Sequence, residues 1–115
     1  MEYNLINYKP AIARLGDDIE LYKILIAFWF EKKQFSKEEL LNLEKTGTNN
    51  ECITYIHSLK GVAANIGAEK LQMAAQKLEN LYHERNQKEK TSAINEVEKL
   101  FIATSTQLKD LENTL

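Results

Sequence analysis

His57 is the residue of this sequence best suited to covalent chemistry, because of what surrounds it at helical spacing. It stands in a run from Thr48 to about Ile66 that opens with a capping box, Thr48 with Glu51, and has apolar residues every three or four positions. At about 100° per residue the apolar residues share one arc, and His57 falls nearly opposite. The imidazole is therefore expected to face water. The core arc comprises Cys52, Tyr55, Ile56, Leu59, Val62, Ala63 and Ile66.

Gly61 lies one helical turn after His57 on the same outward face. A glycine inside a helix costs about 0.5–1 kcal/mol relative to alanine, and this one serves neither a cap nor the core arc. The missing side chain leaves room for another macromolecule to bring a reactive group to the imidazole. Lys60 adds a cation with three N–H donors, which suits an anionic group such as a phosphoryl group. Together these residues predict a site in which His57 is the nucleophile, Lys60 is the cation and Gly61 leaves room for the partner.

The same face also carries the residues that we expect to contact a partner. Other residues that could do chemistry have simpler structural explanations. Each feature alone is unremarkable, since exposed histidines and lysines are usually plain surface residues, but their coincidence on one face favours function. His83 lacks such neighbours and is interpreted as a surface residue, and Cys52 as a buried, inert thiol. The expected contact residues are Ile53, Thr54, Ala64 and Asn65.

Composition and motifs exclude several classes of function. The chain has 115 residues, enough for one domain (1–115), and 15 basic against 17 acidic residues, which argues against nucleic acid as a partner. One cysteine permits neither an internal disulfide nor a multi-cysteine zinc site, so we expect no metal and a reducing, cytoplasmic compartment. The longest apolar run, 24–30, is far shorter than the roughly 18 residues of a membrane span. There is no HExxH, GxxxxGK[ST] or GxGxxG motif, and so no visible ATP site.

The composition predicts an all-α fold, with one proline, four glycines and no sustained alternation of apolar and polar residues. A short opening helix is expected over 10–15, and a second helix from Asp17 or Asp18 to Lys33 with a broad apolar face. That face consists of Leu21, Leu25 and Phe28 with Tyr22, Ile26 and Trp29 beside them, and implies contact with more than one helix. Further helices are expected over 36–46, either separate or a kinked continuation, and over 48–66, 68–82 and about 94–115.

The run HSLKGVAANIGA, residues 57–68, closely resembles the signature of histidine-containing phosphotransfer (HPt) domains, approximately H-x-L-K-G-x-A-x-x-[ILV]-G. The flanks 13–28 and 71–79 also look like that family. The resemblance implies an up-down four-helix bundle with a short additional N-terminal helix. It also implies that Nε2 of His57 accepts a phosphoryl group from the aspartate of one receiver domain and passes it to the aspartate of another. Lys60 and Gly61 match the family's conserved neighbours.

The resemblance further implies that this chain needs no cofactor, since the magnesium ion belongs to the partner receiver domain. Where some relatives place a glutamine that orients the imidazole, this chain has Glu79, a supporting candidate that can hold a ring N–H but would repel a phosphoryl group if too close. The expected partners are receiver domains of response regulators or of a hybrid histidine kinase, met by a monomer without membrane contact.

Two other functions remain open from the sequence. The chain could be a non-catalytic helical adaptor that binds a receiver or another partner through the same face, or the dimerising phosphoacceptor region of a histidine kinase. The second is disfavoured because no kinase domain follows and its signature differs. The context is also open, between a free-standing protein and the C-terminal domain of a hybrid sensor kinase, which would make it the cytoplasmic part of a membrane-anchored protein.

Overall fold

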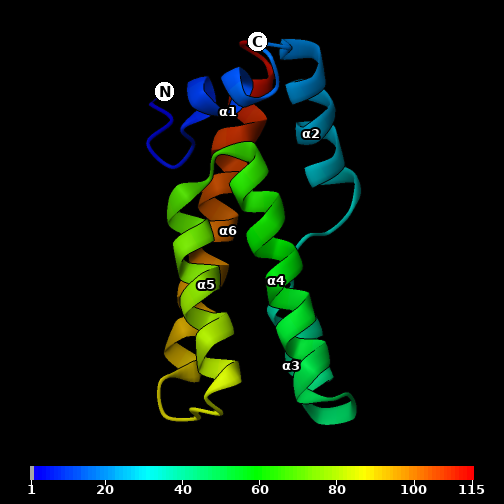
Figure 1. Ribbon diagram of the computed structural model, residues 1–115, viewed down its shortest axis with the longest axis vertical. Helices are drawn as coiled ribbons and strands as arrows, with labels where there is room; N and C mark the ends of the chain where they lie inside the picture. Colours follow the sequence, from blue (N-terminus) through cyan, green and yellow to red (C-terminus); the bar gives the residue numbers. More distant parts are fainter. Residues whose placement is uncertain (1) are drawn as a thin grey trace.

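This computed structural model describes residues 2–115, which contain six helices joined by short loops and no strand (Figure 1). The all-α prediction is therefore confirmed. In chain order the helices are α1 (Tyr8–Arg14), α2 (Ile19–Glu31), α3 (Lys37–Thr46), α4 (Asn49–Ile66), α5 (Glu69–His83) and α6 (Lys90–Glu112).

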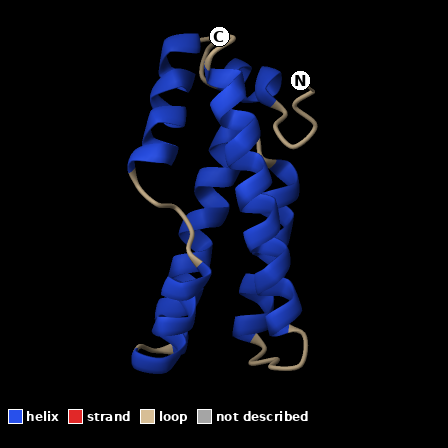
Figure 2. Ribbon diagram, turned by 180° about the vertical axis from the view of Figure 1, so that it is seen from behind, coloured by secondary structure: helices blue, strands red, loops and turns tan. Residues whose placement is uncertain are grey.

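The helices form a four-helix bundle in which α2 and α3 together take the place of one helix. Helices α4, α5 and α6 pack in sequence, while α2 and α3 follow one another along the long axis and both contact α4 and α6 (Figures 1 and 2). Helix α1 caps one end of the bundle against α2 and α4. The molecule measures 41 × 22 × 21 Å. The question left open by the sequence is thus answered, because α3 is a separate helix after the linker 32–36.

Polar caps explain where three of the helices begin. The side chain of Asp18 accepts a hydrogen bond from the backbone at the start of α2, and Ser36 does the same for α3. At the start of α4 the capping box is complete, since Thr48 and Glu51 each bond the other's backbone N–H. The capping box fixes the first residue of α4.

Gly67 ends α4 in the left-handed conformation, with φ of +90°. A Cβ at this position would lie 2.6 Å from the backbone oxygen of Asn7, whose N–H donates to the Gly67 carbonyl at 2.8 Å. Glycine is therefore required here both by backbone conformation and by a close approach of two chain segments. The contact ties the N-terminal segment to the turn between α4 and α5.

The structure corrects several details of the predicted helices. Helix α1 begins at Tyr8, two residues before the expected Pro10, and α2 ends at Glu31. On α2 only the stripe of Tyr22, Ile26 and Trp29 is buried. The neighbouring stripe is partly open, with Leu25 half-buried and Leu21 and Phe28 exposed, because α2 lies at the edge of the bundle and presents one side to α4 and α6. None of the helices in residues 2–115 has the length and apolar character to cross a bilayer.

Candidate functional site

His57 projects from the middle of α4 on the side away from the core, and its side chain is 65% exposed. The core arc behind it is formed as its spacing indicates. Cys52, Ile56, Leu59, Ala63 and Ile66 are buried, while Tyr55 and Val62 are half-buried. Burial raises the pKa of the Cys52 thiol, in keeping with an inert side chain. The helix therefore anchors one face in the bundle and presents the imidazole on the other.

Glu79, on α5, orients the imidazole of His57. Its Oε1 lies 3.1 Å from Nδ1 of the ring, and its side chain is only 11% exposed. A carboxylate only accepts hydrogen bonds, so Nδ1 carries a hydrogen, and the neutral form of the ring then has its lone pair on Nε2. Burial acts to raise the pKa of the Glu79 carboxyl, but hydrogen bonds and positive charge from His57 and Lys60 outweigh it and lower the pKa. Glu79 is thus held as a carboxylate.

Lys60 does not extend freely into solvent. Its Nζ lies 3.1 Å from Oε1 of Glu79 and donates to Oε1 of Gln76 at 2.8 Å, and its side chain is 20% exposed. Gln76 in turn donates to Oδ1 of Asn80 at 2.8 Å. The ammonium therefore bridges α4 and α5 beside His57, and it partly neutralises the carboxylate that holds the imidazole.

Gly61 has open space where its side chain would be. A Cβ built at this position meets no heavy atom within 4 Å beyond its own helix turns, and the residue is exposed. Packing of the fold therefore does not require glycine here, in contrast to Gly67. The helix accepts the cost of an interior glycine without any compensation within the described residues.

The four expected contact residues share the His57 side of α4 but differ in exposure. Thr54 and Asn65 are exposed, while Ile53 and Ala64 are half-buried. Ile53 packs partly against the core, and the backbone oxygen of Ala64 accepts a hydrogen bond from Arg14 of α1 at 3.1 Å. The surface around the imidazole thus mixes accessible polar groups with small or partly covered apolar ones.

His83 is a surface residue, as the sequence analysis expected, but the expectation that it lacks supporting neighbours is wrong. Its Nε2 lies 3.7 Å from Oε2 of Glu79, one turn back on α5, although its side chain is 57% exposed. Gln76 was also missed. The signal was present in the spacing, because Glu79 and His83 are four residues apart on one helix face, where side chains meet.

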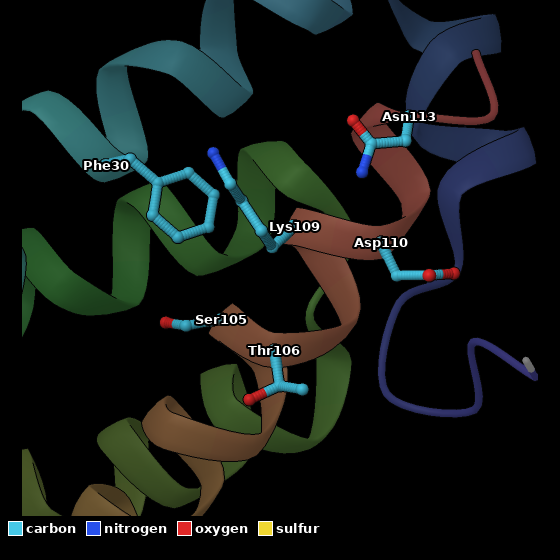
Figure 3. A pocket seen from close by; sticks show the side chains of 6 residues that line it. All are labelled: Phe30, Ser105, Thr106, Lys109, Asp110 and Asn113. Carbon is cyan, nitrogen blue, oxygen red and sulfur yellow. The ribbon is translucent and has the colours of Figure 1, made fainter.

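The pocket in Figure 3 lies away from this site, between the C-terminal part of α6 and the end of α2. It has a volume of about 540 Å³ and is lined by Phe30, Ser105, Thr106, Lys109, Asp110 and Asn113. Its charged groups already have partners, since the Lys109 ammonium lies 5.3 Å from the centre of the Phe30 ring and Asp110 accepts from Tyr3. Within residues 2–115 no cluster of three or more His, Cys, Asp or Glu side chains is arranged to hold a metal ion.

The fold and the site define a helical bundle in which one histidine, oriented by a carboxylate, is exposed on the hairpin of α4 and α5. Residues 30–114 match the family model of the Hpt domain, and the chain belongs to that family. The Hpt family carries out histidine phosphotransfer in two-component phosphorelays and interacts with receiver domains. The match begins near the end of α2, so α1 and most of α2 lie outside it. Searches of curated proteins and of solved structures found no match.

Proposed function

We propose that His57 accepts a phosphoryl group from the aspartyl phosphate of one receiver domain and transfers it to the aspartate of another. The observation that carries this proposal is the orientation of the ring, with Nδ1 bonded to Glu79 at 3.1 Å while the side chain remains 65% exposed. A neutral imidazole held in this way has its nucleophilic lone pair on the nitrogen that Glu79 does not occupy.

The transfer needs no proton to leave the ring. The Nε2 lone pair attacks phosphorus, a P–N bond forms, and the P–O bond to the aspartate breaks so that the aspartate leaves as a carboxylate with the electron pair. Nδ1 keeps its hydrogen, and the phosphorylated ring becomes cationic. The Glu79 carboxylate stabilises this positive charge. In the second transfer an aspartate of the next receiver attacks phosphorus, and the P–N electrons return to Nε2.

Clearance beside Nε2 supports in-line approach of a partner's aspartate. Gly61 exposes only backbone one turn from His57, and beyond its own helix turns no heavy atom lies within 4 Å of a Cβ built there. We assign partner contact to Thr54, Ala64 and Asn65, with Ile53 as a partly covered apolar contact. Positioning supplies most of the catalysis in such a step, since little covalent chemistry is left to the protein.

Lys60 is proposed to stabilise the negative charge of the phosphoryl group. In the resting protein its Nζ donates to Oε1 of Gln76 and lies 3.1 Å from Oε1 of Glu79, so two of its three N–H groups are engaged before the phosphoryl group arrives. We expect magnesium on the receiver domain and no cofactor on this chain. We also propose that the protein acts as a monomer in the cytoplasm, where its receiver partners would meet it.

The test is phosphoryl transfer from a phosphorylated receiver domain, followed by intact mass and acid lability. Wild type should gain one acid-labile phosphoryl group, His57→Gln and His57→Ala should gain none, and His83→Ala should still be phosphorylated, which identifies the acceptor. Circular dichroism should show unchanged helicity in every variant. Binding of receivers without phosphoryl gain in wild type would refute the relay and favour the adaptor function.

A further inference from the structure

The Glu79 carboxylate has more partners than one imidazole requires. Oε1 lies 3.1 Å from both His57 Nδ1 and Lys60 Nζ, and Oε2 lies 3.7 Å from His83 Nε2. In the described residues these are the charged or titratable groups that contact it, two from α4 and one from α5 itself. We propose that His83 is a positioning residue that holds Glu79 through Oε2 while Lys60 turns from Oε1 to the phosphoryl group on His57. This inference rests on the function proposed above.

Lys60 has to move for its proposed role. Its Nζ contacts the carboxylate on the Nδ1 side of the imidazole, whereas the phosphoryl group is attached at Nε2 on the other side of the ring. The contact with Gln76, at 2.8 Å, also directs the ammonium along α5. We therefore expect direct contact with a phosphoryl oxygen to draw Lys60 away from Oε1 of Glu79.

Release of Lys60 would leave a nearly buried carboxylate with one fewer cation. The Glu79 side chain is 11% exposed, and a buried charge that loses its partner is strongly disfavoured. His83 offsets that loss because it approaches the other oxygen and lies four residues away on the same helix, a spacing that movement of Lys60 does not alter. The two basic groups thus act on different oxygens of one carboxylate.

The contribution of His83 is a contact between a basic imidazole nitrogen and the second oxygen of the carboxylate. Since the side chain is largely exposed and 3.7 Å from Oε2, the effect should be modest. We expect His83→Gln to transfer about two- to fivefold more slowly than wild type.

The variants separate charge from shape. His83→Gln removes the charge and keeps a hydrogen-bonding side chain of similar size, while His83→Lys keeps a cation at the same helical position. Lys88→Gln is the matched control, because Lys88 is exposed and its ammonium makes no ion pair within the described residues. Transfer should be slow in His83→Gln, should return to the wild-type rate in His83→Lys, and should be unchanged in the control.

The first measurement is the pKa of the Glu79 carboxyl in the unphosphorylated protein, by NMR titration. His83→Gln removes a basic group 3.7 Å from Oε2, so it should raise the Glu79 pKa, and Lys88→Gln should leave it nearly unchanged. An equal Glu79 pKa in wild type and His83→Gln would overturn the inference whatever the transfer rates.

The second measurement is the ratio of wild-type to His83→Gln transfer rates, once with Lys60 present and once in the Lys60→Gln background. The ratio should exceed one when Lys60 is present and should return to one in the Lys60→Gln background, where Glu79 lacks that partner before and after transfer. A ratio that persists without Lys60 would contradict the proposed exchange. Failure of wild type to accept a phosphoryl group would instead refute the function itself, whereas a ratio of one in active protein that contains Lys60 would overturn only the role of His83.

Discussion

Gly61→Ala should stabilise the fold, because the structure gives this glycine no packing role. The added Cβ meets nothing within 4 Å, and the site lies inside α4, away from both ends. Alanine in a helix interior is favoured over glycine by about 0.5–1 kcal/mol, so the free energy of unfolding should rise by about that amount. In a domain of this size the corresponding rise in Tm is about 2–4 °C.

Urea denaturation followed by far-UV circular dichroism measures this change. Gly67→Ala is the matched control of opposite sign, since its φ is +90° and its Cβ would lie 2.6 Å from the Asn7 oxygen. That variant should lose more than about 1 kcal/mol. If Gly61→Ala were less stable than wild type, the glycine would have a structural role and the argument from open space would be wrong.

The same site should respond differently to a large side chain when function is measured. Gly61→Leu should keep the bundle folded, because the space beyond Cα is open, but it should block approach of a receiver domain to His57. The rate of phosphoryl transfer, receiver binding and helicity by circular dichroism, all measured on the same preparation, separate a block of receiver approach from a loss of folding. Undiminished transfer by a folded Gly61→Leu variant would refute steric clearance as the reason for the glycine.

Three further predictions concern other groups. Thr104→Val should raise the free energy of unfolding by about 1–2 kcal/mol in chemical denaturation, because the buried Thr104 hydroxyl has no hydrogen-bond partner in the described residues; a loss of stability would indicate one. Lys60→Ala should slow phosphoryl transfer about tenfold, equivalent to about 1.4 kcal/mol, through loss of a charge-assisted hydrogen bond; unchanged kinetics would remove Lys60 from the site. The folded-state pKa of Glu79 lies below its ordinary value of 4.5, so its ionised form stabilises the fold above that value and this stability is lost as pH falls through the lowered pKa. The stabilities of wild type and Glu79→Gln should therefore converge as the pH falls through the lowered pKa of Glu79, and curves that stay parallel in acid would contradict this.

The features of α4 could be predicted from the sequence because local rules determine them. The capping box of Thr48 and Glu51 sets where the helix begins, Gly67 sets where it ends, and the period of 3.6 residues then places His57 opposite the core. None of these depends on where a neighbouring helix lies. The predicted position of the imidazole therefore needed no tertiary information.

The contacts between helices could not be predicted in the same way. Which α5 residue meets His57 depends on how α4 and α5 are aligned along their axes, and periodicity within one helix does not determine that alignment. The contacts of Lys60 with Glu79 and Gln76 were consequently not part of the prediction, which gave Lys60 only an anionic ligand. The buried side of α2 is a similar case, since only packing at the edge of the bundle decides which of two apolar stripes is covered.

The position of Glu79 answers the objection that a carboxylate beside the acceptor histidine would repel a phosphoryl group. The carboxylate contacts Nδ1, so the ring stands between it and a group attached at Nε2. Lys60 offsets part of its charge in the resting protein, and the ring itself becomes cationic once phosphorylated, so the carboxylate gains an attractive partner as the phosphoryl group arrives. A glutamine could orient the ring equally well but could not stabilise that charge. Glu79→Gln should therefore keep the ring in place, with an unchanged Nδ1–H tautomer by NMR, yet lower the equilibrium fraction of phosphorylated His57 relative to wild type.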